Sequence, residues 1–256
     1  MIGIFGGTFD PVHFGHLRPA LDVKQALGLR EMRLIPAFQP PHREQPEANP
    51  GQRLTMLRAA VGSESDLLVD ACEMQREGES FMVDTLTLLR EEVGDEPMCL
   101  VLGADAFLQL DSWHQWEKIL QLAHVVVTHR PGWELDVNGA SETIQQLWRE
   151  RHVEDAAEFK SSPVGRIISL TVTPLEISAT KIRALVAAGN SPRYLVPDAV
   201  WNLIRMHGLY GFSAEQKAAE ERAVTQKAAE AESIKAANNS NSSNNNSNNR
   251  RIRINK

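Results

Sequence analysis

Short apolar runs alternate with longer amphipathic segments up to about residue 212 of the chain. The runs are rich in Ile, Leu, Val and Met and predict buried strands at residues 1–5, 31–38, 67–74, 98–103, 123–130 and 166–173. Apolar residues at helical spacing predict helices at 15–27, 52–61, 81–92, 113–121, 141–151, 179–188 and 198–207. This alternation favours a doubly wound, Rossmann-like α/β fold, in which helices flank both faces of a mostly parallel sheet.

The composition changes after Phe212. Residues 213–237 are rich in Ala, Glu and Lys and contain few large apolar residues, which predicts a helix with little to bury. Residues 238–256 are an Asn/Ser run followed by RRIRINK, and such a polar segment predicts disorder because it cannot offset its chain entropy by burial. We therefore expect one domain at 1–212, followed by a helical and then disordered tail. A functional interpretation of the tail is a small basic contact through RRIRINK.

Composition narrows the class of protein. The chain has 256 residues, of which 42% are hydrophobic, and a formal net charge of -6, which argues against a broad nucleic-acid surface. Cys72 and Cys99 have no CxxC partner, so we expect neither a disulfide framework nor a cysteine-based zinc site. With no signal-like leader and no apolar run of about 20 residues, we expect a cytoplasmic protein without membrane contact, either a monomer or a homodimer.

The first candidate site is GGTFDPVHFGH, at residues 6–16. Gly6 and Gly7 end a predicted strand, where glycines permit unusual backbone angles and let backbone N–H groups approach a ligand closely. His13 and His16 then lie on one face of the first helical turn. The stretch alone allows a plain turn, a metal site or a phosphate site at a helix N-terminus.

A second candidate lies far along the chain, in TPLEISATKIRALVAAG at residues 173–189. Ser178 is suited to cap the helix that follows it, and Thr180, Lys181 and Arg183 occupy its first turns. Cations at a helix start conflict with the helix dipole unless an anion is bound there. Two helix starts suited to anions in one domain favour the phosphate interpretation of both motifs.

Together, GGTFDPVHFGH and ISATKIR resemble the nucleotidylyltransferase superfamily. PPHR, EANPGQRLTML, LGADAFLQLDSWHQWEKIL and THRPG occur between them, and this ordered set is similar to bacterial nicotinate-nucleotide adenylyltransferases. The resemblance covers about residues 1–211. It implies transfer of AMP from ATP to nicotinate mononucleotide, giving nicotinate adenine dinucleotide and pyrophosphate, with Mg²⁺ held through the ATP phosphates and by no protein ligands. An already ionised phosphate nucleophile needs in-line positioning and charge neutralisation rather than a covalent intermediate.

The same resemblance implies roles for individual residues. His16 would contact the α-phosphate and carry most of the transition-state charge, with His13 beside it as the second catalytic residue. The implied ATP site comprises Gly7, Thr8, Phe9, Asp10, Gly103, Asp105, Ser178, Thr180 and Arg183. The implied nicotinate mononucleotide site comprises Trp113, Met82, Thr85, His42, Arg43 and Arg130. Within these sets Asp10 would orient the turn, Asp105 would meet the ribose and Trp113 would stack on the nicotinate ring.

One departure from the family affects the second substrate. Where the family commonly has SYT, this chain has Ser80-Phe81-Met82, so two hydroxyls that could bind the nicotinate carboxylate are missing. A lost hydrogen bond to a carboxylate can cost roughly 1.5–3 kcal/mol, which is enough to blur selectivity for acid over amide. The first alternative is an adenylyltransferase acting on nicotinamide mononucleotide, phosphopantetheine or another phosphorylated acceptor. The others are a nucleotide sensor without catalysis and an assembly scaffold acting through residues 213–256.

Two structural interpretations stand beside these roles. Trp116 is the residue of SWHQWEKIL that we expect to anchor in the core. Asp105 is a candidate N-cap for a helix over AFLQL.

Overall fold

The computed structural model describes residues 1–41, 45–64, 66–76, 78–132, 135–159 and 161–213, with scattered positions from 215 to 230. The chain divides into two units, Met1–Tyr210 and Gly211–Lys256. The segment expected to be disordered and most of the helix expected at 213–237 lie outside the described residues. Within the described part, no helix combines the length and apolar character needed to cross a bilayer.

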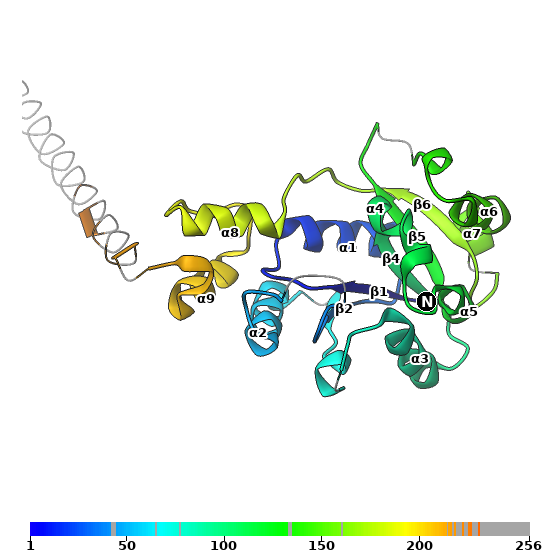
Figure 1. The fold of residues 1–256 in the computed structure, drawn as a ribbon, viewed down its shortest axis with the longest axis horizontal. Helices are drawn as coiled ribbons and strands as arrows, with labels where there is room; N and C mark the ends of the chain where they lie inside the picture. The colour runs from blue at the N-terminus through cyan, green and yellow to red at the C-terminus, as the bar shows by residue number, and fades with distance from the viewer. Residues whose placement is uncertain are drawn as a thin grey trace, which may run out of the picture. The chain divides into compact units, whose positions relative to one another are not determined.

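The first unit is built on a sheet of six parallel strands (Figure 1). Their order across the sheet is β3-β2-β1-β4-β5-β6. The strands are β1 (Ile2–Gly7), β2 (Glu31–Pro36), β3 (Leu67–Val69), β4 (Met98–Gly103), β5 (His124–His129) and β6 (Ile167–Thr171). The expectation of a doubly wound, mostly parallel α/β fold is confirmed.

Helices cover the sheet, and Figure 1 shows α1 and α3 on opposite sides of β1. The α-helices are α1 (Phe14–Leu27), α2 (Pro50–Val61), α3 (Met82–Val93), α4 (Ala104–Phe107), α5 (Ile119–Leu122), α6 (Glu142–Arg151), α7 (Ala156–Phe159), α8 (Ala179–Ala187) and α9 (Asp198–His207). Short 3-10 helices are η1 (Cys72–Gln75), η2 (Leu110–Ser112), η3 (Trp116–Lys118), η4 (Val137–Gly139) and η5 (Leu209–Gly211). On one face, alternate residues of β1, β4 and β5 form a buried core with Leu86 and Leu89 of α3, Ile119 of α5 and Ile144 of α6.

Two predicted elements differ from the structure by more than small shifts of their ends. The strand expected at 67–74 ends at Val69, because the Asp70 carboxylate accepts from the Cys72 N–H and turns the chain into η1. The helix expected at 113–121 is interrupted at Gln115, whose φ of 50° lies in the left-handed region, so only η3 and α5 form there.

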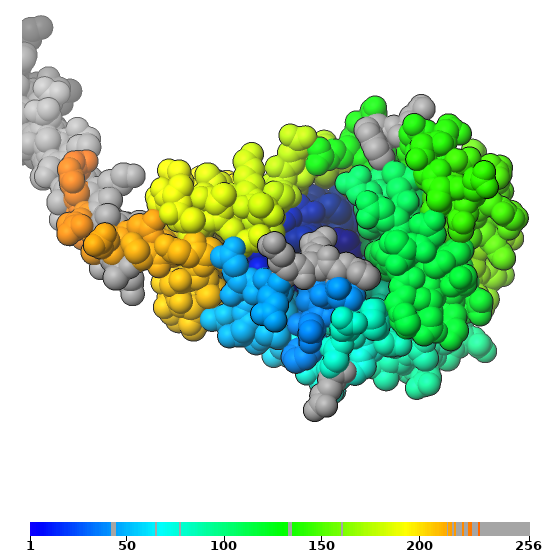
Figure 2. All heavy atoms as spheres, viewed as in Figure 1, coloured from blue at the N-terminus to red at the C-terminus, as the bar shows by residue number. Residues whose placement is uncertain are grey.

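The sheet opens at the point where the direction of winding reverses. β1 pairs with β2 up to Gly7 and Pro36, and β4 pairs with β5 up to Gly103 and Thr128. The ladder between β1 and β4 already ends at Ile4 and Leu100. Neighbouring carboxyl ends that separate in this way form the crevice in which doubly wound folds bind ligands. Figure 2 shows the N-terminal residues recessed between α8 and the segments that follow β4.

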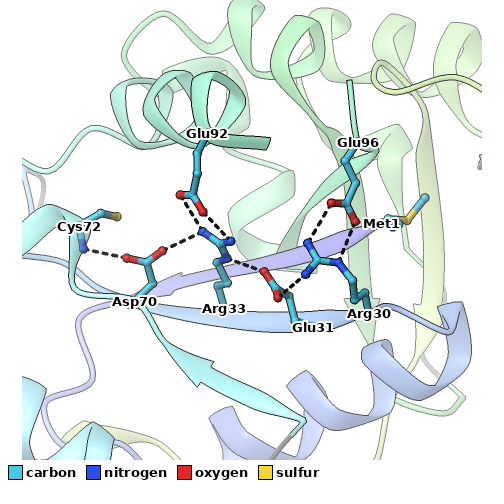
Figure 3. Close-up of polar contacts among 8 residues, drawn as sticks. All are labelled: Met1, Arg30, Glu31, Arg33, Asp70, Cys72, Glu92 and Glu96. Carbon is cyan, nitrogen blue, oxygen red and sulfur yellow. Dashed lines mark hydrogen bonds and ion pairs between the residues drawn. The ribbon is translucent and has the colours of Figure 1, made fainter. Parts of the chain in front are cut away.

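A chain of ion pairs fixes α3 to the sheet (Figure 3). Arg33 of β2 contacts Glu31, Asp70 and Glu92 at 2.8, 3.2 and 2.9 Å. Hydrogen bonds and charge from Glu92, the largest contributor, and from Glu31 raise the pKa of the Arg33 guanidinium. Arg30 and the Met1 amino group both contact Glu96, whose pKa is lowered to about 2, chiefly by the hydrogen bond from Arg30. The network ties the carboxyl end of α3 to β2, and so holds the helix whose other end, Met82, reaches the crevice.

Candidate active site

We call the end of β1, Gly6–Gly7, and the residues that follow it the glycine turn, which lies in the crevice. The strained residue of this turn is not a glycine. Neither Gly6 nor Gly7 has a positive φ, whereas Phe9 has a φ of 51°. The expectation that these glycines supply unusual backbone angles is therefore wrong. They lie close to neighbouring side chains instead: a Cβ on Gly6 would displace the Met82 methyl, and one on Gly7 would meet the Phe9 ring at 3.0 Å. Phe9 holds a conformation that costs a bulky residue energy, of the kind found at ligand-binding turns.

His13 and His16 are stacked, with ring centroids 3.7 Å apart. His13 is the N-cap residue of α1, and its backbone N–H donates to His16 Nδ1 at 3.3 Å. Because Nδ1 accepts, the proton of a neutral His16 lies on Nε2. His13 is 4% exposed, and burial lowers its pKa to about 4, so its imidazole is neutral at pH 7. Its Nδ1 atom is buried with no hydrogen-bond partner in the described part of the chain.

Asp10 organises the turn through both carboxylate oxygens. Oδ2 accepts from the Glu47 N–H at 2.9 Å, and Oδ1 accepts from the Ala48 N–H at 3.2 Å. Oδ1 also accepts from the Tyr210 hydroxyl at 2.7 Å. Burial raises the pKa of Tyr210, so the phenol stays protonated and donates. The structure thus places Asp10 beneath the turn, with its oxygens already engaged by donors of the chain.

The two candidate helix starts lie side by side. A Cβ on Gly15, in the first turn of α1, would meet the Ile177 carbonyl oxygen at 3.1 Å, a tight contact that shows how closely the two segments approach. Arg183 of α8 donates to the Asp10 carbonyl oxygen at 2.9 Å and to Glu47 Oε1 at 2.8 Å. The expected cap is confirmed, because Ser178 Oγ accepts from the Lys181 N–H at 3.2 Å. Two motifs about 160 residues apart therefore form one surface with exposed hydroxyls at Ser178 and Thr180.

Residues expected near adenosine follow β4. Gly103 is the N-cap residue of α4, and Asp105 is exposed within the first turn of that helix. The interpretation of Asp105 as an N-cap is therefore wrong, since the cap falls two residues earlier and uses no side chain.

Residues expected near nicotinate have different surroundings. Trp113 is half-buried and packs against the core, as does Met82 at the start of α3. Thr85 is fully buried and donates to Glu73 Oε1 at 2.6 Å, so its hydroxyl faces into the protein. Arg130 is exposed and pairs with Glu176 at 2.6 Å. His42 and Arg43 lie outside the described residues.

The choice of Trp116 as the core tryptophan is wrong. Trp116 is half-buried and lines a surface hollow with Leu120 and Leu147, whereas Trp113 packs against the main core. The reason is the left-handed residue Gln115, which breaks the amphipathic helix that the spacing of the two tryptophans predicts.

Sequence reasoning missed Arg53, Tyr210 and Glu47. The sequence pattern could have indicated Arg53. It lies at helical spacing with the buried residues Met56 and Leu57, which places a cation on the apolar face of α2. No local pattern indicates Tyr210 or Glu47, because each contacts the site through a hydrogen bond to a residue far away in the sequence.

The protein offers no cage for a metal ion among its described residues. No group of three or more His, Cys, Asp or Glu side chains there could hold one. Asp10, the carboxylate beneath the turn, already accepts from two N–H groups and a hydroxyl. Mg²⁺ commonly keeps waters and substrate phosphates as ligands and so does not require a cage built entirely of protein side chains.

The sheet opens at its winding reversal, where the turn strained at Phe9 and two adjoining helix starts suit the binding of a nucleotide. The profile of the cytidylyltransferase-like family matches residues 4–185, from β1 into α8, and the chain belongs to this family. Within it, the chain groups with nicotinate-nucleotide adenylyltransferases. It is 47% identical over 211 residues to a probable nicotinate-nucleotide adenylyltransferase of Methylococcus capsulatus, covering 82% of this chain and 99% of that one. It is 47% identical over 207 residues to a counterpart in Acidithiobacillus ferrooxidans, covering 81% and 94% of the two chains.

Solved structures share the fold. The nicotinic acid mononucleotide adenylyltransferase of Plasmodium falciparum, complexed with NaAD, superposes with a TM-score of 0.63 at 17% identity, covering 83% of this chain and 98% of that one. A nicotinate-nucleotide adenylyltransferase structure from Vibrio parahaemolyticus superposes with a TM-score of 0.53 at 14% identity, covering 79% and 97%. At these identities the likeness concerns the fold alone.

Proposed function

We propose that this chain transfers the adenylyl group of ATP to nicotinate mononucleotide, giving nicotinate adenine dinucleotide and pyrophosphate in NAD biosynthesis. The observation that carries the proposal is the junction of the two helix starts, where Gly15 meets the Ile177 carbonyl and Arg183 reaches the Asp10 carbonyl. Helix N-termini with hydroxyls and a guanidinium are suited to a chain of phosphates. The family and its nicotinate-nucleotide relatives support the choice of reaction.

The nucleophile is a phosphate oxygen of the mononucleotide, and its attack on the α-phosphate forms one P–O bond as the bond to pyrophosphate breaks. Because that oxygen is already ionised near neutral pH, the protein needs to align the groups and neutralise charge. His16 Nε2–H donates to the α-phosphate, and the neutral His13 ring stacked on it fixes its orientation. Ser178, Thr180 and Arg183 hold the β- and γ-phosphates. Mg²⁺ bound through the ATP phosphates would supply further neutralisation of phosphate charge there.

From the start of α8, where the β- and γ-phosphates bind, ATP extends along the glycine turn. Backbone N–H groups at Gly7, Thr8 and Phe9 line the phosphates, and Asp10 keeps the turn in place. Gly103 leaves room for the adenosine, and Asp105, exposed at the start of α4, accepts from the ribose hydroxyls.

Nicotinate mononucleotide enters between α3 and the segment after α4. Trp113 stacks on the ring, and Met82 and the backbone at Thr85 form the wall at the start of α3. Arg130, with His42 and Arg43, helps to close the nucleotide site. For Arg183 and Arg130, substrate binding requires exchange of the present carboxylate partners, Glu47 and Glu176.

The test is pyrophosphate release from ATP with each candidate acceptor. Turnover with nicotinate mononucleotide is expected, and its complete absence would overturn the proposal. The second candidate acceptor is nicotinamide mononucleotide, which the loss of two hydroxyls at Phe81 and Met82 favours. The Phe81 ring instead packs on His114, with centroids 4.3 Å apart. A cytoplasmic location and a monomeric or homodimeric state stay predictions, as does the domain limit at Phe212.

A further inference from the structure

A fully buried arginine lies behind the glycine turn. Arg53 is in the first turn of α2, and its side chain is 0% exposed. The helix begins at Pro50 after the N-cap Asn49, whose side chain accepts from the Gln52 N–H, and this capped start aims Arg53 inward.

Every hydrogen bond of the Arg53 guanidinium goes to a backbone carbonyl oxygen. Nε donates to Ala48 at 3.2 Å, and Nη2 donates to Phe38 at 3.0 Å. Nη1 donates to both Thr8 at 2.8 Å and Ala37 at 2.6 Å. Among the described residues, the hydrogen-bond acceptors of this cation are therefore neutral carbonyl groups, and none is a carboxylate.

These four carbonyls belong to three separate segments that border the crevice. Thr8 follows β1 in the glycine turn, Ala37 and Phe38 follow β2, and Ala48 precedes α2. The segment after β2 is also connected to α3, because Ser80, just before that helix, accepts a hydrogen bond at Oγ from the Phe38 N–H at 2.8 Å. One side chain thus sets the spacing between the turn proposed for ATP and the segment leading to α3.

Stability alone does not explain a charge in this position. Burying an ion costs several kcal/mol, and well-packed apolar residues often replace buried charges without loss of stability. Burial lowers the pKa of Arg53 below its usual range, and the negative charges of Asp10 and Glu73 oppose this only in part. A planar group with five donors is, by contrast, what a junction of several carbonyls requires.

We propose that Arg53 is a positioning residue for adenylyl transfer, which fixes the Thr8–Phe9 turn against the Ala37–Phe38 segment and adds positive charge beneath the phosphates. The proposal rests on the proposed function for its effect on turnover. Its geometric part stands independently, because the clamp exists without substrate.

The test compares Arg53→Met and Arg53→Lys with Arg58→Met, which removes an exposed arginine from the same helix. Arg53→Met keeps an apolar stem of similar length and loses all donors. Arg53→Lys keeps the charge but loses the planar fork, and it remains informative if the methionine variant does not fold. For each folded variant, kcat and KM for ATP are measured by pyrophosphate release well below the unfolding temperature, together with hydrogen exchange of segments 2–10 and 34–40.

We expect kcat to fall by about tenfold or more in Arg53→Met and by a smaller factor in Arg53→Lys, because misplacement by about 1 Å can cost on the order of 10²-fold. KM for ATP should change by less than about threefold, a split that a merely structural residue would not produce once the folded fraction is accounted for. Exchange should rise in both segments, and Arg58→Met should match the unsubstituted protein throughout.

Folded Arg53 variants with unchanged kcat and unchanged exchange would overturn the proposal. If the unsubstituted protein shows no turnover, the proposed function fails instead, and the exchange data alone decide whether the clamp exists. Increased exchange with unchanged kcat would reduce Arg53 to a structural role and would also overturn it.

Discussion

At the scale of single residues, hydrogen bonding and burial determine which ring nitrogens of His13 and His16 carry a proton. His16 Nδ1 accepts from the His13 N–H, and the two rings are stacked. Two charged imidazoles at this separation would repel each other, and burial already keeps His13 neutral. His16 is therefore the histidine that presents an N–H donor while its neighbour holds its orientation.

The role of His16 is tested by His16→Ala. Removal of a donor to the charge that develops on the α-phosphate should lower kcat by about 10²-fold or more. ATP should still bind, because Arg183 and the start of α8 remain. Turnover by pyrophosphate release and ATP affinity by calorimetry give the two quantities, with His207→Ala, at an exposed position on α9, as the control. Wild-type turnover in His16→Ala would show that phosphate handling is assigned to the wrong residue.

Buried His13 should make the stability of the protein depend on pH. Its folded-state pKa of about 4 lies below the unfolded value of 6.5, so between these pH values the unfolded chain binds more protons than the folded one. The free energy of unfolding should therefore fall as pH decreases from 6.5 towards 4, with a slope of up to about 1.4 kcal/mol per unit from this group. Burial also lowers the pKa of His124, so this residue should likewise reduce the free energy of unfolding as pH decreases.

Urea unfolding at pH 7.5, 6 and 5 isolates the contribution of His13. The His13→Gln variant should lose less stability between pH 7.5 and pH 5 than the unsubstituted protein does. Equal losses in the two proteins would mean that His13 titrates normally in the folded state.

Tyr210 connects the end of the first unit to the N-terminal motif. Tyr210→Phe leaves Asp10 Oδ1 with only the donor from Ala48, and the free energy of unfolding should fall by about 1–3 kcal/mol. Denaturant unfolding measures this change against Tyr194→Phe, whose side chain is 89% exposed and whose loss should matter little. Equal stabilities of the two variants would contradict the account of Asp10.

At the scale of elements, the start of α8 should combine a cap with a substrate contact. Ser178→Ala removes both, whereas Ser178→Gly retains most of the capping preference and removes only the hydroxyl. Under the proposed function, both variants should raise KM for ATP, while only the alanine variant should lose about 1 kcal/mol of stability. Ser141→Ala removes the N-cap of α6 and is the matched control, expected to lose stability with KM unchanged. An unaltered KM in Ser178→Gly would exclude a hydroxyl contact with ATP.

How far the sequence predicts these elements depends on the range of the interactions that form them. Strand β4 has the predicted bounds, 98–103, because a continuous apolar run defines it locally. β3 is shorter than predicted because the Asp70 side chain forms a local turn, and the helix at 113–121 fails because Gln115 adopts a left-handed conformation. The cap at Ser178 was predictable from residue type, whereas the four-carbonyl junction at Arg53 requires the tertiary fold.

At the scale of the whole molecule, the reversal of winding between β1 and β4 brings the two motifs together. The ladder ends at Ile4 and Leu100, and the glycine turn, α1 and α8 meet beyond it. The family match, residues 4–185, spans both motifs.

The catalytic account does not involve residues 213–256. A chain that ends at Phe212 should therefore keep its turnover and its oligomeric state, measured by pyrophosphate release and light scattering. Reduced turnover, or a changed number of subunits per particle after truncation, would show that the C-terminal segment contributes to function or assembly.

The central claim concerns the second substrate, and the most direct measurement is kcat/KM for pyrophosphate release with ATP and either nicotinate or nicotinamide mononucleotide. The account predicts the higher value with nicotinate mononucleotide, because the backbone N–H groups at the amino end of α3 favour a carboxylate even without the hydroxyls absent at Phe81 and Met82. A higher value with nicotinamide mononucleotide would contradict it.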